Sequence, residues 1–337
     1  MAKKAIFDKK NVLVIGGAGF IGSHLCDELI KNSKVICLDN FITGDERNID
    51  HLLAEANFEF IKHDISQPLD LTNLPELQKF KIEFQGVQEI YQLACPTSPK
   101  NFDQNKIATL MALSAGVKNS LDLAKKYDAK FIYFSSSVIY GPRPRTNIKT
   151  KESDLGQVDP ISWRSSYDEG KRFAEALVAN YQQVYHLNAG IMRLFRVYGP
   201  RMKLNEGHLI PDFINNALDN KDLIIPGDKS FASSFCYVSD VIDAALKLIE
   251  SDIAEPVNIG SDIDINLTAL AQMIIDKLNS NSKIKYNVRH LFISELRLPD
   301  ITKARNELGW LPIVTLDKGL AKTIDDLRAS KGLKTVI

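Results

Sequence analysis

The chain has 337 residues, of which 45% are hydrophobic and 25% are charged, a composition typical of a globular protein with a sizeable core. Its 42 basic and 42 acidic side chains give a formal net charge of zero, which argues against a generic binder of nucleic acid or of membrane surfaces. The start of the chain lacks a secretion-signal pattern, and no apolar run reaches the roughly 18 residues of a membrane span. The four cysteines are scattered along the sequence. We therefore expect a cytoplasmic protein with reduced thiols.

Short apolar runs alternate with helical segments over the first 195 residues. Six runs have the nearly continuous hydrophobicity of strands that are buried on both faces, namely residues 11–16, 35–39, 58–64, 89–94, 130–136 and 188–194. Helical spacing is clearest at 105–126 and 166–186, and the long link 65–88 is expected to end in an extra helix. Strands that alternate with helices predict an α/β protein with a Rossmann-type, doubly wound parallel sheet.

The regular alternation fades after about residue 195, where Pro and Gly interrupt the sequence. We expect helices at 208–220 and 239–250 and short strands at 223–225 and 257–259. The prediction is a first domain of residues 1–195 and a smaller C-terminal α/β domain that is mostly residues 196–337. Some of the later segments can return to the first sheet.

A glycine-rich turn follows the first predicted strand. The segment VIGGAGFIGSH places Gly16, Gly19 and Gly22 between this strand and a helix, where glycine lets the backbone approach a diphosphate at the helix N-terminus. Asp39 ends the next strand and can accept hydrogen bonds from a ribose with a free 2′-hydroxyl, whereas it would repel a 2′-phosphate. The first domain is therefore predicted to bind NAD rather than NADP; the alternative is a purely structural glycine turn.

Tyr167 and Lys171 are four residues apart on a predicted helix and therefore share one face. A tyrosine normally titrates near 10, and a nearby ammonium together with a nicotinamide cation would lower that pKa, so that Tyr167 can act as a base. Ser136 and Ser137 end a predicted strand beside the same crevice, where a hydroxyl can bind a substrate oxygen. The alternative is that Tyr167 and Lys171 belong to a solvated helix face.

The chain resembles the extended short-chain dehydrogenases/reductases that modify nucleotide sugars, the NAD-dependent epimerase/dehydratase family. The segments GGAGFIGSHLCDELI, LDNFITGDERNI, WRSSYDEGKR, YGPRM, YVSD and LRLPDITKARNELGW are most similar to the UDP-glucuronate decarboxylase group. The resemblance implies that bound NAD takes hydride from carbon 4 of the sugar while the tyrosine takes the hydroxyl proton. The 4-keto sugar then loses CO2, loses water, or is reduced on its other face.

The resemblance also assigns residues to three sets. The catalytic set is Tyr167, Lys171, Ser137 and Ser136. The cofactor-binding set is Gly16, Gly19, Phe20, Ile21, Gly22, Asp39, Asn40, Asp64, Ile65, Leu93, Ala94 and Lys171. The substrate-binding set is Pro96, Arg164, Arg196, Arg201 and Arg297. The histidines have no metal-site spacing, so no metal is expected.

Several positions depart from the decarboxylase pattern. Val138 stands where the decarboxylases have a glutamate, and Ser233 stands where they have an arginine. Arg196 and Leu113 replace asparagines. Because an arginine fork suits phosphate oxygens, we hypothesise that Arg196 takes over part of the role of the arginine missing at 233; the alternative is a salt bridge at the domain junction.

Three functions remain open at this stage. Three serines followed by an apolar residue favour a UDP-sugar or UDP-uronate 4-epimerase, because a glutamate helps a second proton transfer that epimerisation does not need. The alternatives are a UDP-glucuronate decarboxylase that forms UDP-xylose, and a non-catalytic NAD-binding sensor or scaffold. Cys95 is a candidate thiol, although a small buried residue is the simpler interpretation. Apolar faces at 105–126 and 166–186 suggest a homodimer, or helices that simply pack on the sheet.

Overall fold

The structure is a computed structural model that describes residues 9–143, 149–287 and 296–334. Residues 1–8, which contain most of the start that we compared with secretion signals, lie outside the described residues. Within the described ranges, no helix combines the length and the apolarity needed to cross a membrane. The four cysteines are free thiols.

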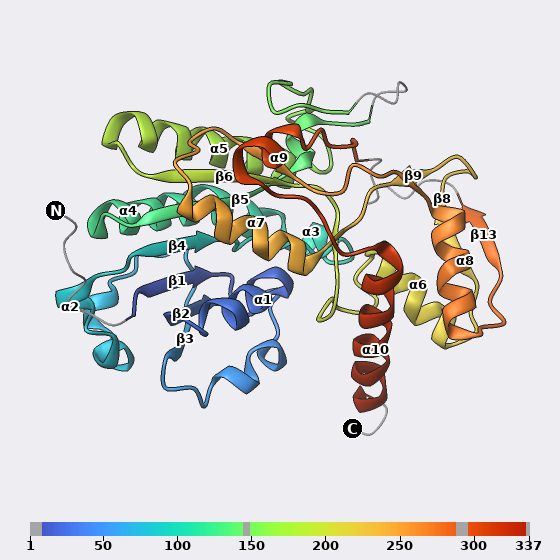
Figure 1. The fold of residues 1–337 in the computed structure, drawn as a ribbon, viewed down its shortest axis with the longest axis horizontal. Helices are drawn as coiled ribbons and strands as arrows, with labels where there is room; N and C mark the ends of the chain where they lie inside the picture. Colours follow the sequence, from blue (N-terminus) through green and yellow to red (C-terminus); the bar gives the residue numbers. More distant parts are fainter. Residues whose placement is uncertain (1–8, 144–148, 288–295, 335–337) are drawn as a thin grey trace.

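Seven parallel strands form the main sheet in the order β11-β6-β5-β4-β1-β2-β3 (Figure 1). They are β1 (Asn11–Ile15), β2 (Lys34–Asp39), β3 (Phe58–Lys62), β4 (Glu89–Gln92), β5 (Lys130–Ser136), β6 (Ala189–Leu194) and β11 (Val257–Ile259). The predicted Rossmann-type sheet is therefore confirmed. The strand order reverses between β1 and β4, so a crevice is expected at the carboxyl ends of these strands.

Helices cover both faces of this sheet. One face carries α1 (Phe20–Leu29) and α7 (Val238–Glu250), and the other carries α4 (Val117–Tyr127) and α5 (Ser165–Tyr185). The alternation of β1 explains both layers, because Val12 and Val14 join the core cluster of α1 and α7 while Leu13 and Ile15 join that of α4 and α5. The helix expected at 105–126 is in fact α3 (Phe102–Met111) and α4, joined by a π-helical turn at 112–116.

The long link before β4 contains little regular structure. It holds the 3-10 turns η3 (Leu71–Asn73) and η4 (Pro75–Phe80), and it ends in the short helix α2 (Ile82–Gln85), as expected for its tail. Leu71, Leu77 and Phe80 are buried in the α4 and α5 layer, so the link closes one end of the core.

The C-terminal part builds a smaller body beside the sheet. Its helices are α6 (Leu209–Leu218), α8 (Leu267–Leu278), α9 (Thr302–Leu308) and α10 (Leu316–Lys334). Its strand pairs are β8 (Leu223–Pro226) with β13 (Ile284–Asn287), β9 (Ala232–Ser233) with β12 (Ile265–Asn266), and β7 (Val197–Tyr198) with β10 (Cys236–Tyr237). Both α7 and β11 return to the main sheet. The division into domains at residue 195 stays a prediction.

Candidate active site

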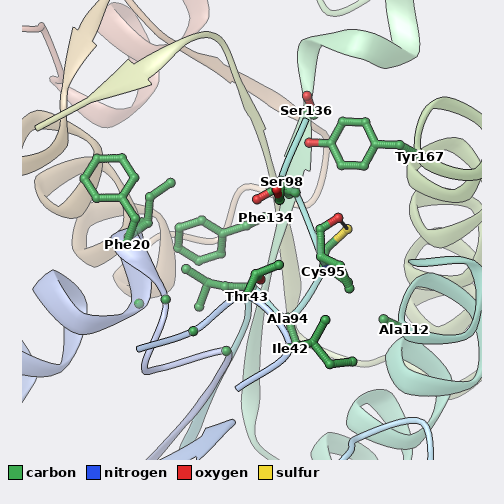
Figure 2. A pocket seen from close by; sticks show the side chains of 18 of the residues that line it. Phe20, Ile42, Thr43, Ala94, Cys95, Ser98, Ala112, Phe134, Ser136 and Tyr167 are labelled. Carbon is green, nitrogen blue, oxygen red and sulfur yellow. Dashed lines mark hydrogen bonds between the residues drawn. The ribbon is translucent and has the colours of Figure 1, made fainter. Parts of the chain in front are cut away.

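A cavity of about 440 Å³ opens at the carboxyl ends of the central strands, between the sheet and the C-terminal body. Figure 2 shows it from close by. The predicted site residues that line it are Gly16, Gly19, Phe20, Ile21, Gly22, Asp39, Asn40, Asp64, Ile65, Leu93, Ala94, Pro96, Ser136, Arg164, Tyr167, Lys171, Arg196 and Arg201. Ser137 and Arg297 are not part of its lining. The individual roles stay predictions, but the fold brings nearly all of these residues together.

The glycine turn is too tightly packed for other residues. Gly16 has a φ of +85°, and a Cβ there would lie 2.7 Å from the Ala94 nitrogen. A Cβ on Gly22 would lie 2.1 Å from the Gly16 oxygen. These contacts bring the N-terminus of α1 close to the end of β4, the arrangement that leaves room for a diphosphate. The turn therefore fits a dinucleotide.

Asp39 is buried at the end of β2 and is held by backbone donors. Its Oδ2 accepts from the Ala18 N–H at 3.0 Å, and its Oδ1 accepts from the Phe41 N–H at 2.8 Å. Burial raises the pKa of the Asp39 carboxyl, and these N–H donors and Lys203 oppose the rise. Each oxygen keeps a further lone pair, so the carboxylate can still accept hydrogen bonds from ribose hydroxyls.

Tyr167 extends from the first turn of α5 into the cavity. Figure 2 shows its hydroxyl directed toward Ser136, the last residue of β5. Burial raises the pKa of Tyr167 well above its usual value, the neighbouring Cys95 adds to this, and a hydrogen bond with Ser136 opposes it. Loss of solvent thus outweighs the nearby charges here, and the lowering of this pKa that we expect from Lys171 together with a nicotinamide cation stays a prediction. In this state Tyr167 is protonated and can donate a proton; it can accept one only as the phenolate, which Lys171 together with a bound nicotinamide cation would favour.

Lys171 is buried one turn further along α5. Its Nζ donates a hydrogen bond to the Phe134 carbonyl at 2.5 Å and lies 4.9 Å from the centre of the Tyr133 ring. Burial lowers the pKa of Lys171, whereas Cys95 and Glu175 raise it. The helix spacing therefore does place Tyr167 and Lys171 on one face, and this face turns inward rather than to solvent.

Ser136 and Ser137, at the end of β5, have different surroundings. Ser136 lines the cavity, but Ser137 begins the 3-10 turn η6 (Ser137–Tyr140) and has a buried hydroxyl without a hydrogen-bond partner. Ser136 is thus better placed than Ser137 to touch a substrate oxygen. Val138 lines the cavity and contributes an apolar surface there.

Two arginines border the substrate side of the cavity. Arg164 forms an ion pair with Asp168 at 3.2 Å. Arg196 lies between β6 and β7, and its Nε donates to the Ser233 hydroxyl at 3.0 Å. Burial, and then the neighbouring Arg164, lower the pKa of Arg196 to about 10. The Arg196 guanidinium therefore lies against position 233, where the resemblance expects an arginine.

The other two predicted substrate arginines are held elsewhere. Arg201 lines the cavity, but its Nη2 forms an ion pair with Asp27 at 2.7 Å. Arg297 donates from Nε to the Pro142 carbonyl at 3.1 Å and is not part of the lining. Its expected contact with the diphosphate stays a prediction.

Three charged or titratable residues of the cavity follow the YGPRM motif and were not predicted from the sequence. The Lys203 Nζ donates a hydrogen bond to the Gly44 carbonyl at 3.0 Å, and its charge acts on the nearby Asp39 carboxyl. Glu206 accepts a hydrogen bond from Ser98, and this bond joins two loops that line the cavity. His208 lines the same side, and burial together with Arg196 lowers its pKa to about 4. Their position immediately after a recognised motif was the available signal.

Cys95 is not an activated thiol. Burial raises its pKa to about 11, and the proximity of Lys171 only partly opposes this. A neutral thiol at physiological pH is a poor nucleophile, in agreement with the simpler interpretation of this residue. Among the described residues, no group of three or more His, Cys, Asp and Glu side chains could hold a metal ion.

Known proteins are similar to this chain in sequence and in fold. The NAD dependent epimerase/dehydratase family matches residues 12–260. UDP-glucuronic acid decarboxylase 5 of Arabidopsis thaliana is 37% identical over 329 residues, which cover 96% of this chain and 90% of that protein. The solved structure of a UDP-glucose 4-epimerase of Thermotoga maritima with UDP-glucose is similar to this fold with a TM-score of 0.83 and 26% identity, and the match covers 95% of this chain and 99% of that one. The structure of a UDP-glucuronic acid 4-epimerase of Bacillus cereus with UDP-glucuronic acid and NAD is similar with a TM-score of 0.80 and 27% identity, and the match again covers 95% of this chain and 99% of that one. The chain therefore belongs to the NAD-dependent epimerase/dehydratase family of extended short-chain dehydrogenases/reductases, and it is an NAD-dependent enzyme that acts on nucleotide sugars.

Proposed function

We propose that the protein converts UDP-glucuronic acid through a 4-keto intermediate and that the intermediate loses CO2. Arabidopsis UDP-glucuronic acid decarboxylase 5 matches this chain at 37% identity across almost its whole length. The Bacillus cereus epimerase was solved with the same sugar nucleotide. The preference for decarboxylation therefore differs from the epimerase interpretation that the serine strand alone favoured.

The observation that carries the substrate class is the pair of guanidinium groups beside Tyr167. Arg164 and Arg196 both line the cavity and are near enough for one to lower the pKa of the other. A UDP-uronate carries negative charge on its diphosphate and on its sugar carboxylate, and arginine forks bind such oxyanions through paired hydrogen bonds. An anion bound beside both groups would be attracted by each of them.

The residues present can carry out the chemistry. NAD, when bound, supplies the acceptance and return of a hydride. In this proposal Tyr167, as the phenolate that Lys171 and the nicotinamide cation would favour, takes the proton of the sugar 4-hydroxyl, and Ser136 donates a hydrogen bond to the same oxygen. Both side chains line the cavity. The oxidised sugar is a β-keto acid, so the bond between C5 and the carboxylate carbon breaks with its electron pair moving into an enolate on the C4 oxygen. The Tyr167 and Ser136 hydroxyls can stabilise that oxygen, and a proton then adds at C5.

One observation favours a second candidate, 4-epimerisation of the same substrate. Val138 lines the cavity at the position where the decarboxylases are expected to carry a glutamate. Without a second acid or base at that position, the keto sugar has to be reduced again before it reacts further. The base, the hydroxyl and NAD are sufficient for that outcome.

NMR of the purified enzyme with NAD and UDP-glucuronic acid separates the two outcomes. A UDP-xylose or UDP-4-keto-pentose signal with release of CO2 supports decarboxylation in spite of Val138. A galacto-configured uronate with no CO2 supports epimerisation. If neither appears while UDP-glucose or UDP-N-acetylglucosamine is converted, the uronate proposal is wrong.

We further propose that the enzyme is a homodimer that buries α3 and α5. Large apolar side chains stay exposed on these two helices, namely Ile107, Leu110, Met111, Phe173, Val184 and Tyr185. Exposed apolar side chains gathered on two helices in contact with each other are a feature of interfaces between subunits. Light scattering of the wild type and of Phe173→Glu tests this, because a charge at the interface should produce monomers. A wild type that is monomeric at micromolar concentration contradicts the proposal.

A further inference from the structure

Glu175 is a buried carboxylate that the chemistry above does not use. It lies on α5 four residues after Lys171, which itself lies four residues after Tyr167, so the three side chains share one helix face. Glu175 forms an ion pair with Arg193 of β6, in which Nη2 and Oε2 are 2.7 Å apart and Nε lies 3.1 and 3.2 Å from the two oxygens. Each side chain is only 11% exposed.

The ion pair between Glu175 and Arg193 contacts Ser135, which is the first of the three serines at the end of β5 and the first residue of segment 135–140. Ser135 and Arg193 are register partners on β5 and β6, and α5 covers these strands (Figure 1). The Ser135 hydroxyl donates to Glu175 Oε1 at 2.5 Å. One carboxylate therefore joins the catalytic helix to two adjacent strands.

Arg193 also reaches the other end of this segment. Its Nη1 donates to the Tyr140 hydroxyl at 2.8 Å and to the Glu152 carbonyl at 2.8 Å. The Tyr140 hydroxyl donates in turn to Asn258 Oδ1 at 2.7 Å, on β11. Ser135 and Tyr140 border the turn that contains Ser136, Ser137 and Val138, and the ion pair contacts both of them.

We propose that Glu175 and Arg193 are positioning residues that hold both ends of segment 135–140 against α5, and thereby set the geometry of Ser136, Tyr167 and Lys171. Three successive contacts then join β5 to one face of α5. The side chains of Ser136 and Tyr167 are hydrogen-bonded, the Phe134 carbonyl accepts a hydrogen bond from Lys171, and the Ser135 hydroxyl donates one to Glu175. The proposal rests on the NAD-dependent chemistry of the family and not on the fate of the keto sugar.

A positioning role can be separated from a stabilising one. Buried ion pairs are weak evidence for stability, because apolar side chains of similar volume often replace them without loss of folding. Apolar replacements cannot, however, accept the Ser135 hydrogen bond or donate to Tyr140. A folded variant with an apolar pair would keep the core and lose the two contacts.

Glu175 also affects the charge of Lys171. The groups that influence Lys171 are Cys95 and Glu175, and the rings of Tyr133 and Tyr167 lie 4.9 and 5.9 Å from its Nζ. Glu175 raises the pKa of Lys171, so removal of the carboxylate should lower that pKa. Any property that needs the Lys171 ammonium should then be lost at a lower pH, an effect that a merely structural pair would not produce.

The test is the double variant Glu175→Leu/Arg193→Met, compared with Glu28→Leu/Lys31→Met, which removes an exposed ion pair at the C-terminal end of α1. We expect the first to stay folded and to lose kcat by roughly 10- to 100-fold, as displaced catalytic groups do, with a smaller change in KM. The control should keep wild-type kcat. A folded variant with wild-type kcat overturns the proposal.

Two further measurements keep the proposal testable. If the double variant does not fold, Ser135→Ala/Tyr140→Phe removes both contacts and leaves the ion pair, and it should also lower kcat; full activity overturns the proposal. If the wild type does not convert UDP-glucuronic acid, the proposed substrate is wrong, and the affinity for NAD alone is measured against pH. The alkaline loss of NAD affinity should move to lower pH in Glu175→Gln, which removes the negative charge and keeps Arg193, and an unchanged profile overturns the proposal.

Discussion

The two sides of the cavity are built from different parts of the chain. The side expected to face NAD is largely backbone, with the glycine turn packed against the end of β4 and with Asp39 held by two N–H groups. The side expected to face the sugar consists of side chains, among them Arg164, Arg196 and Val138. A binding surface made of backbone atoms tolerates few substitutions, so its ligand stays the same as the sequence changes. A side-chain surface can change its chemistry with a single substitution, which is where this chain departs from the decarboxylase pattern.

Tyr167→Phe should have the largest effect on activity, because Tyr167 is expected to act where the NAD side and the sugar side of the cavity meet. Loss of the only expected base should lower kcat by about 10²- to 10⁴-fold. NAD affinity should change little, since the ring and Lys171 remain. Turnover by NMR and NAD binding by calorimetry measure the two quantities. A variant that keeps substantial turnover contradicts the assigned base.

Gly22→Ala tests the backbone side. The new Cβ would lie 2.1 Å from the Gly16 oxygen, so the turn has to open. We expect loss of NAD binding and a fall of about 1–3 kcal/mol in the free energy of unfolding, as for other overpacked sites. Gly19→Ala is the matched control, because its Cβ would lie 3.2 Å from the same oxygen. Equal effects of the two substitutions on NAD affinity would argue against close packing as the cause.

Asp39→Asn separates charge from shape on the same side. The amide keeps the size of the side chain but loses one acceptor oxygen and the negative charge. NAD affinity should fall by about tenfold, the usual weight of a charge-assisted hydrogen bond, while affinity for NADP should rise relative to NAD. Fluorescence titration with both dinucleotides gives the ratio. An unchanged ratio is incompatible with selection by Asp39.

Arg196→Ala tests the side-chain surface. If Arg196 binds the UDP diphosphate or the uronate, UDP affinity or UDP-glucuronic acid affinity should fall by about tenfold. Arg328→Ala, an exposed arginine on α10, is the matched control and should have no effect. Calorimetry with both ligands identifies which anion is bound. Unchanged affinity for both would remove Arg196 from the substrate site.

Cys95→Ala should have the smallest effect. A thiol whose pKa is raised to about 11 stays protonated at neutral pH, so it contributes no nucleophile there. Activity should stay within about twofold of the wild type, and iodoacetamide should inactivate the wild type only as the pH approaches that pKa. Rapid inactivation at neutral pH would contradict the raised pKa.

Much of this molecule could be predicted because its signals are local. Apolar runs identified the strands of the main sheet, and the glycine spacing located the dinucleotide turn. The choice between Ser136 and Ser137 was not predictable, because it depends on where β5 ends and η6 begins. The raised pKa of Tyr167 depends on burial by distant segments. The contact between Glu175 and Arg193 joins a helix to a strand through side chains that show no pattern in the sequence.

The position of β11 has a consequence for biosynthesis. This strand completes the edge of the main sheet beside β6, yet it lies about 65 residues later in the chain. At a synthesis rate of 5–20 residues per second, the β6 edge is therefore without its partner for roughly 3–13 s. An unpaired edge strand is a site for wrong association. The nascent chain should depend most on chaperones during this interval, and a fragment that ends at residue 195 should aggregate rather than fold.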